Sequence, residues 1–312
     1  MWAAYGSPAL GPLLSGFSVQ ETTWQWSMYE VLILSGFTFI LLFFFLPETN
    51  PETILLRRAR GLRIQTGNPN LHSQSEAKDR ELRFLPLLGL YLTTPFRVTV
   101  LDPSVAFINV YTALVYAIYY SYFDSFPVVY MDIYGFSLGI MGVVFLAIIV
   151  ASFIGAAIYT LLLWKIYEPY TKKMGIGKPE RRLVPGIVAA AFAPAGIILF
   201  GWTSRSSIHW VVPSIGVVTF SASLFIIFNV VIIYLPTSYP RYAASLFAAN
   251  TFLRSALACA AIHFAQPLFS NLSIGKGCTL LGGLAAGCFF GIVILWYYGP
   301  SLRARSRFAE TY

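Results

Sequence analysis

The feature that most constrains this chain is a series of long apolar segments. A helix of roughly 20 apolar residues crosses a bilayer core of about 30 Å. Only 11% of the 312 residues are charged, against about 25% in soluble domains, too few to keep a whole surface in water. The sequence therefore predicts an all-α, polytopic membrane protein with eight spans: residues 2–19, 26–46, 100–120, 138–163, 184–203, 211–235, 243–265 and 277–298.

The basic residues predict the orientation of these spans, because cytosolic loops carry an excess of Lys and Arg. Of the 21 Lys and Arg, two lie in the loops of one side, and Arg254 lies inside a span. The other eighteen lie in the alternate loops and the tail: 47–97, 164–183, 236–242 and 299–312. Both termini are therefore expected in the cytosol. The net charge of +8 reflects this topology and does not indicate a nucleic-acid partner.

Several ordered motifs run along the chain. The stretch SPALGPLLSGF contains Gly11, Pro12 and Gly16, and LPET ends the second apolar segment. Further motifs are WQW, LLRRA, YTALVYAIYYSYFDSFPVVYMDIYGFSLG and YPRYAASLFAANTFLRS. Together they resemble the major facilitator superfamily, specifically its fungal drug:proton antiporters related to cycloheximide, fluconazole and polyamine exporters. In this resemblance Gly11, Pro12 and Gly16 belong to the antiporter motif of a fifth helix.

The resemblance implies twelve spans, six on each side of a central loop, whereas this chain has two before its hydrophilic segment. We therefore expect residues 1–46 to form two helices of an incomplete N-terminal half and 47–97 a basic cytosolic linker. Residues 98–298 are expected to form a six-helix C-terminal half, and 299–312 a basic cytosolic tail. The first four helices are expected to be missing from this sequence and to belong to a longer gene product.

The function that the resemblance implies is proton-coupled export of small organic molecules such as drugs, toxins or polyamines. The partners would be the lipid bilayer, the substrate and protons, and the location a plasma membrane. The alternative is a truncated, non-transporting membrane fragment or interaction remnant of such a transporter.

Ionisable groups within spans are functional candidates, since each costs roughly 2.5–3.5 kcal/mol on insertion scales. Arg254 lies midway through a span, and Asn250 lies one helical turn before it on the same face. Arg254 could hold an anionic group or tune a carboxylate, or it could bind neighbouring helices structurally. Glu30 is a candidate proton carrier or a solvated interfacial residue. Asp124 could shape the outer mouth or titrate during transport, or be a loop carboxylate.

A polar and aromatic stripe recurs at helical spacing along the third predicted span. It predicts one face that lines a cavity or packs in the core, and its members are Asn109, Thr112, Tyr116, Tyr120 and Phe123. Such aromatic faces would suit flat, amphipathic or cationic molecules. Asn229, in the sixth predicted span, is a further candidate for the cavity lining.

No pattern in the sequence predicts an enzyme, a cofactor or a metal site. Residues 135–139 spell G-x-S-x-G, but the nucleophile elbow with this pattern needs a strand before it and a helix after it on a soluble sheet. Here the pattern opens an apolar span and is interpreted as chance. Gly283, Gly287 and Gly291 are spaced for close helix packing, which is a structural role.

Overall fold

The computed structural model describes residues 2–73, 76, 84–169, 172 and 179–304. This described part is mostly helical and contains no strand. Seven of its helices are long and apolar enough to cross a membrane, which confirms the prediction of an all-α, polytopic membrane protein. They are Trp24–Phe45, Pro103–Ile133, Leu138–Lys165, Glu180–Thr203, Val211–Ser238, Ala243–Asn271 and Ile274–Leu302.

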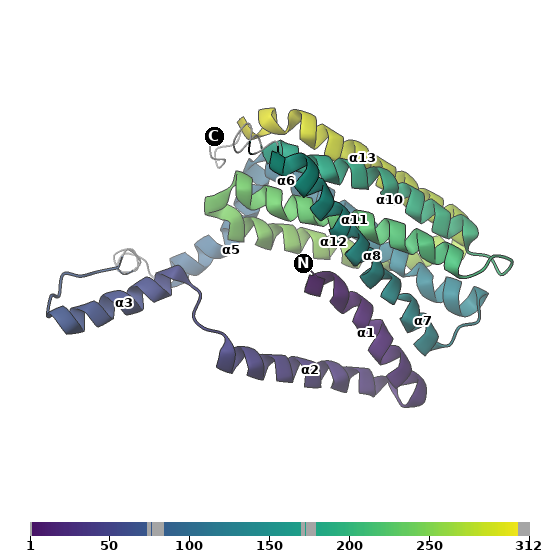
Figure 1. Cartoon of the computed structure of the whole chain (residues 1–312), viewed down its shortest axis with the longest axis horizontal. Coiled ribbons are helices and arrows are strands. Elements are labelled where there is room, and N and C mark those ends of the chain that lie inside the picture. Colours follow the sequence, from purple (N-terminus) through teal and green to yellow (C-terminus); the bar gives the residue numbers. More distant parts are fainter. Residues whose placement is uncertain (1, 74–75, 77–83, 170–171, 173–178, 305–312) are drawn as a thin grey trace. The chain divides into compact units, whose positions relative to one another are not determined.

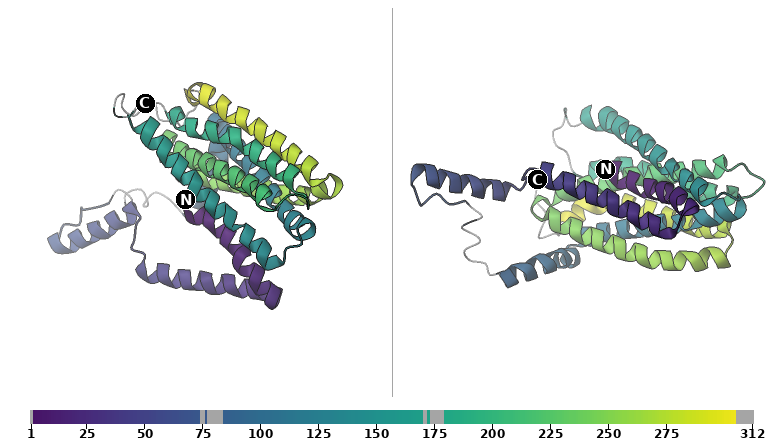
Figure 2. Two further views of the ribbon diagram at one scale, coloured as in Figure 1. Left: turned by 45° about the vertical axis from the view of Figure 1, so that its right-hand side comes forward. Right: turned by 90° about the horizontal axis from the view of Figure 1, so that it is seen from below.

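The chain divides into two compact units, residues 1–27 with 95–312, and residues 28–94. In the first unit six helices lie side by side as a bundle (Figures 1 and 2). These are α6 (Pro103–Phe123), α8 (Leu146–Leu162), α10 (Val184–Thr203), α11 (Val211–Ser238), α12 (Ala243–Asn271) and α13 (Ile274–Ala304). The first unit also contains α1 (Trp2–Glu21) and α7 (Leu138–Val144).

Short helices of other types extend or connect the long ones. Two are π-helices and two are 3₁₀-helices: η1 (Pro127–Ile133), η2 (Leu163–Tyr167), η3 (Pro179–Leu183) and η4 (Pro240–Tyr242). Because η1 follows α6 and η2 follows α8, both spans are longer than their α-helical parts.

Asp102 and Pro103 fix the start of α6. The Asp102 carboxylate accepts hydrogen bonds from the backbone N–H groups of Ser104 at 2.9 Å and Val105 at 3.2 Å. Proline suits the first helical position because it has no N–H to leave unsatisfied. The predicted start of this span, Val100, therefore lies three residues before the start of α6. The preceding helix, α5 (Phe84–Leu101), ends directly before Asp102, which caps α6.

The turn before α7 depends on Gly135 and Ser137. Gly135 has a φ of +70°, a left-handed conformation that glycine adopts without a steric penalty. The Ser137 side chain then accepts the backbone N–H of Ile140 and caps α7. The serine of the G-x-S-x-G pattern thus has a helix-capping role in this structure.

Helices α10 and α11 make backbone contact through two glycines. A Cβ added at Gly196 would lie 2.7 Å from the backbone nitrogen of Phe220 and 2.9 Å from the carbonyl oxygen of Gly216. A Cβ at Gly216 would lie 2.7 Å from the carbonyl oxygen of Gly196. The two helices therefore approach as closely as they do only because neither position carries a side chain.

The close approach predicted at the glycines of α13 is largely absent. A Cβ at Gly283 or Gly287 would meet nothing within 4 Å among the described residues, so that prediction is wrong for both. At Gly291 it would lie 3.3 Å from the ring of Tyr111. Glycine spacing alone did not reveal which face of α13 meets its neighbours.

The second unit contains most of α2 (Trp24–Phe45), all of α3 (Pro51–Thr66) and the first part of α5 (Phe84–Leu101). Helix α2 has no buried residue. Asn50 caps α3, and Gly67 ends it with a φ of +66°. Arg63 pairs with Glu76 and lowers the pKa of that carboxyl to about 2.

Helix α2 matches the predicted span 26–46. Helices α3 and α5 were not part of the sequence prediction, which treats residues 47–97 as a linker without assigning helices to it. Part of that linker, residues 74–75 and 77–83, lies outside the described residues. The same holds for residues 305–312 of the predicted tail, whereas α13 continues as far as Ala304. Helix α1 matches the first predicted span but is not among the seven long, apolar helices.

Candidate functional site

Arg254 lies on α12 and is half-buried, with its guanidinium against two aromatic rings. The guanidinium carbon is 4.5 Å from the ring centroid of Tyr116 on α6 and 5.7 Å from that of Phe228 on α11. Cation–π contacts of this kind contribute about 2 kcal/mol when they are desolvated, which offsets part of the cost of an arginine within a membrane span. The Nε atom of Arg254 is buried and finds no hydrogen-bond partner among the described residues.

Tyr120 extends this aromatic setting along α6. Its hydroxyl lies 3.2 Å from the hydroxyl of Tyr116, and the two ring centroids are 4.8 Å apart. The predicted helical spacing thus brings both tyrosines to one face. We call Arg254, Tyr116, Tyr120 and Phe228 the arginine–aromatic cluster.

A network of amides and hydroxyls joins α12 to α6 and α5. The side-chain nitrogen of Asn250 donates to the Asn109 side-chain oxygen at 2.9 Å and to the Thr112 hydroxyl at 2.6 Å. Asn109 in turn donates to the Thr99 hydroxyl at 3.0 Å. Asn109, Thr112 and Asn250 are all buried, so the network satisfies polar groups that would otherwise be costly in an apolar bundle. We call these four residues the asparagine network.

The arginine–aromatic cluster and the asparagine network lie on the same two helices. Asn250 and Arg254 are one turn apart on α12, as Thr112 and Tyr116 are on α6. The two helices pack directly against each other. The structure therefore brings together six of the residues singled out in the sequence: Arg254, Asn250, Asn109, Thr112, Tyr116 and Tyr120.

Asn229 and Phe123 do not join this group. The Asn229 side chain donates to the carbonyl of Phe225 on its own helix at 2.7 Å. The ring centroid of Phe123 lies 4.2 Å from that of Tyr119 and 5.2 Å from that of Phe126.

The two candidate carboxylates lie elsewhere. Asp124 follows the last residue of α6 and lines a pocket of about 450 Å³ that also includes Asp132 and Gln266. Glu30 is on the part of α2 that belongs to the second unit.

The predicted antiporter-motif helix is α1, and part of its motif packs against α7. A Cβ at Gly142 of α7 would lie 2.5 Å from the carbonyl oxygen of Pro12, and one at Gly16 would lie 2.9 Å from the carbonyl oxygen of Leu138. A Cβ at Gly11 would meet nothing within 4 Å in the described part of the chain. The Gln20 side chain accepts the backbone N–H of Gly139 at 3.0 Å, which adds a polar contact to this crossing.

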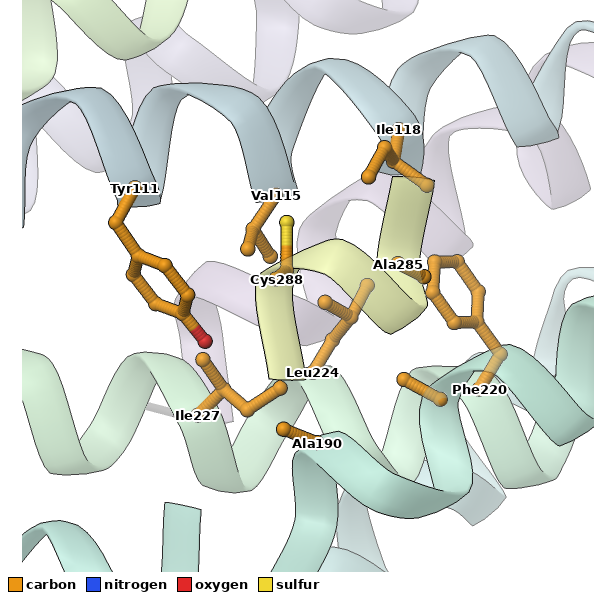
Figure 3. A pocket seen from close by; sticks show the side chains of 10 residues that line it. Tyr111, Val115, Ile118, Ala190, Phe220, Leu224, Ile227, Ala285 and Cys288 are labelled. Carbon is orange, nitrogen blue, oxygen red and sulfur yellow. The ribbon is translucent and has the colours of Figure 1, made fainter. Parts of the chain in front are cut away.

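A small void lies between α6, α10, α11 and α13 (Figure 3). Its volume of about 10 Å³ is close to the lower limit for a single water molecule. Its lining is almost entirely apolar, and the figure shows the Tyr111 hydroxyl pointing toward Ile227. This void is a packing defect in the core and is far too small for an organic substrate.

Sequence reasoning missed three residues that take part in these contacts. Phe228 supplies the second ring against Arg254, Thr99 ends the asparagine network, and Gln20 binds α7. Phe228 is adjacent to Asn229, but α11 is apolar on all sides, so its facing could not be read from the sequence. Thr99 lies between the predicted linker, which ends at residue 97, and the predicted span that begins at residue 100, so no role was assigned to it.

Comparisons with known proteins agree with this architecture. The Major Facilitator Superfamily profile matches residues 1–262. The chain is 42% identical to the "MFS-type transporter pyvG" of Aspergillus violaceofuscus, over 99% of this chain and 57% of the relative. It is 39% identical to the "Cycloheximide resistance protein" of Candida maltosa, over 98% of this chain and 57% of the relative. No solved structure gives a significant match.

A third relative, "Fluconazole resistance protein 1" of Saccharomyces cerevisiae, is 35% identical over 99% of this chain and 57% of its own length. The chain thus spans a little over half the length of the curated relatives that it matches. The family profile covers most of the chain, and these relatives are transporters or drug-resistance proteins by name. The chain belongs to the Major Facilitator Superfamily.

Proposed function

We propose that this chain is part of a proton-coupled exporter of small organic molecules and that the arginine–aromatic cluster lines its substrate path. The observation that carries the proposal is the guanidinium of Arg254 against Tyr116 and Phe228, with its Nε atom buried and unbonded among the described residues. A charged group with unused hydrogen-bonding capacity inside a membrane protein is a functional candidate.

The chemistry of the cluster favours one type of substrate. Aromatic rings supply flat apolar surface, and a guanidinium donates hydrogen bonds to carbonyl, carboxylate or phosphate oxygens. The positive charge would repel a polyamine. We therefore favour flat, amphipathic molecules with oxygen acceptors, and relatives named for cycloheximide and fluconazole resistance support export of drug-like compounds.

Proton coupling needs a group that gains and loses a proton during the cycle. Glu30 and Asp124 are our proposed carriers, because both are carboxylates at or within predicted spans. We further propose that the protein lies in the plasma membrane with both termini in the cytosol, as the distribution of basic loops indicates. Pro12 and Gly16 of the antiporter motif would act at the moving contact between α1 and α7.

A second candidate function is a non-transporting membrane fragment. It is favoured by one observation, that the chain spans 57% of the length of its relatives. In transporters built from repeats, alternating access moves one repeat against another around a shared site.

The test of the first proposal is drug efflux from yeast cells that lack their own exporters. The cells would express the longest open reading frame that contains residues 1–312, and retention of a labelled cycloheximide-like compound would be measured with and without a protonophore. We expect Arg254→Ala to reduce proton-dependent efflux at least tenfold, and Arg254→Lys to retain part of it, because lysine keeps the charge but not the planar stacking.

The matched control is Arg205→Ala. Arg205 also lies near an aromatic ring, 6.0 Å from Trp202, but it is exposed beyond the end of α10. We expect this variant to export normally. Normal efflux by an Arg254→Ala protein that reaches the membrane in normal amounts would show that the cluster is not part of the substrate path.

A further inference from the structure

An apolar crevice runs along the bundle between α8 and α10. It consists of two adjoining grooves of about 360 Å³ and 400 Å³, which share Leu162, Pro185 and Val188. Because the shared residues line both grooves, the two form one continuous depression. We call it the α8–α10 crevice.

The inner part of the crevice is built from one face each of α8 and α10, together with residues of α11: Val218, Thr219, Ala222, Ser223 and Ile226. Ile154, Ile158 and Leu162 recur every four residues along α8, and Val188 and Phe192 lie one turn apart on α10. The eight steps from Ile154 to Leu162, at 1.5 Å each, correspond to about 12 Å of helix. That length is most of the hydrocarbon depth of one leaflet, which is about 15 Å. Phe192 is 57% exposed and Val188 48%, so this apolar surface is open to the surroundings.

The mouth of the crevice, at the end near residues 164–183, is basic. Arg181 and Arg182 line it together with Tyr167 and Trp296, and no carboxylate lines it among the described residues. Tryptophan favours the headgroup layer of a bilayer, so Trp296 indicates the depth at which this mouth lies.

Arg182 is held in a fixed position at this mouth. Its Nε donates to the Tyr167 hydroxyl at 2.9 Å, one terminal nitrogen donates to the Thr237 hydroxyl at 3.4 Å, and the guanidinium carbon is 5.3 Å from the Tyr167 ring centroid. These two bonds use two of the five N–H donors of the guanidinium. Within the part of the chain that the structure describes, Arg182 makes no ion pair.

Two acidic residues lie near the mouth. Glu168 lines a groove that shares Leu163, Tyr167 and Arg182 with the mouth, and it pairs with Lys172 at 2.8 Å. Glu180 is buried. Because Glu168 is paired with Lys172, the described charged side chains around the mouth carry a net positive charge.

We propose that the α8–α10 crevice binds one anionic phospholipid. Arg181 and Arg182 bind its phosphate and headgroup, and one acyl chain lies along Ile154, Ile158 and Phe192. Basic pockets between spans at the cytoplasmic side of a membrane bind anionic headgroups in this way. A zwitterionic lipid would fill the apolar part equally well but would bring no net negative charge to the basic mouth. The proposal is independent of the function assigned to the arginine–aromatic cluster.

The test measures lipid retention by the purified full chain. The protein would be extracted in an uncharged detergent and incubated with equal amounts of phosphatidylserine and phosphatidylcholine, and bound lipids would be counted by native mass spectrometry. We expect one phosphatidylserine to be retained at least tenfold more strongly than phosphatidylcholine. The same lipid should raise the melting temperature of the protein in proportion to its concentration.

Two kinds of variant separate the headgroup from the acyl chain. Arg181→Gln removes an exposed charge at the mouth, and Val188→Trp fills the crevice without changing any charge. Each is expected to reduce phosphatidylserine retention at least tenfold. Arg205→Gln is the matched control, because Arg205 follows the opposite end of α10 and lies beside Trp202. We expect it to retain the lipid as the unmodified protein does.

Three results would overturn the proposal. Equal retention of phosphatidylcholine would mean that the crevice holds bulk lipid, and displacement of the lipid by inorganic phosphate alone would mean a site for free anions. Unchanged retention in both Arg181→Gln and Val188→Trp would place the bound lipid elsewhere on the protein.

Discussion

Asp102 shows how a charged residue can serve the fold of a membrane protein. It is fully buried, and one of its oxygens accepts hydrogen bonds from two backbone N–H groups and from the Tyr239 hydroxyl at 3.2 Å. These bonds join the start of α6 to the residue that follows α11. Asp102 directly precedes a proline, a combination typical of a helix start, and its capping bonds show that it has this role.

We expect Asp102→Ala to destabilise the protein by about 0.5–2 kcal/mol, the usual cost of losing a helix cap. Asp102→Asn should cost less, because asparagine is as good a cap as aspartate. The measurement is the melting temperature of the detergent-purified protein, and Asp132→Ala, at an exposed position, is the control. Equal melting temperatures for Asp102→Ala and the unmodified protein would contradict the capping role.

For Arg254, the sequence predicted the position of the residue within a span but not the side chains that surround it. Its place within a span and its turn spacing from Asn250 follow from the sequence. Its ring partners do not, since Tyr116 and Phe228 are far from it along the chain and meet it only through helix packing. The sequence thus shows which residue is energetically costly to place in a membrane span, whereas the contacts that stabilise that residue come from distant parts of the chain.

For the individual helices, hydropathy predicts where a helix occurs better than it predicts which face of that helix packs against its neighbours. Helix α10 spans Val184–Thr203, the same residues as the predicted span, because both ends coincide with a sharp change in hydropathy. The packing face of α10 was not predicted, and the glycine spacing of α13 gave a wrong face, because both helices are apolar on nearly every side and carry no periodic contrast. Helix α3 was missed for another reason: its composition is hydrophilic, although Asn50, Pro51 and Gly67 are typical helix-boundary residues.

The contact between α10 and α11 gives a prediction at this scale. We expect Gly216→Ala to lower stability by about 1–3 kcal/mol, the usual cost of overpacking, because the new methyl group would meet backbone atoms that cannot move separately. Gly283→Ala on α13 should leave stability unchanged or raise it, since nothing described lies within 4 Å of its Cβ position. Thermal unfolding of the two variants side by side would make the comparison. A Gly216→Ala protein as stable as Gly283→Ala would show that the helices separate without cost.

For the whole molecule, the relevant property is its length, which is a little over half that of the curated relatives it matches. The chain spans 57% of the transporters that it resembles, and α2 exposes an almost wholly apolar surface in its own unit. A surface of this kind needs lipid or other helices to cover it. We therefore propose that export requires protein segments in addition to these 312 residues.

Two polypeptides would be expressed separately in the same exporter-deficient yeast. A polypeptide limited to residues 1–312 is expected to insert in the membrane and give no proton-dependent efflux above background. The longest open reading frame that contains these residues is expected to export if it encodes four further apolar spans before Met1. Robust proton-dependent efflux from the 312-residue polypeptide alone would contradict this expectation and remove the fragment hypothesis.

The amino-acid sequence was enough to predict that the protein is helical and lies in a membrane, and approximately where its spans begin and end. These properties depend on the hydropathy of neighbouring residues and on local capping, as at Asp102 and Pro103. Three features could be seen only in the packed structure. Phe228 contacts Arg254, Asn109 donates a hydrogen bond to Thr99, and α8 and α10 leave a crevice beside Arg182. The reason is physical: in a helix that is apolar on all sides, no periodic contrast marks the buried face, so packing between distant segments sets the contacts.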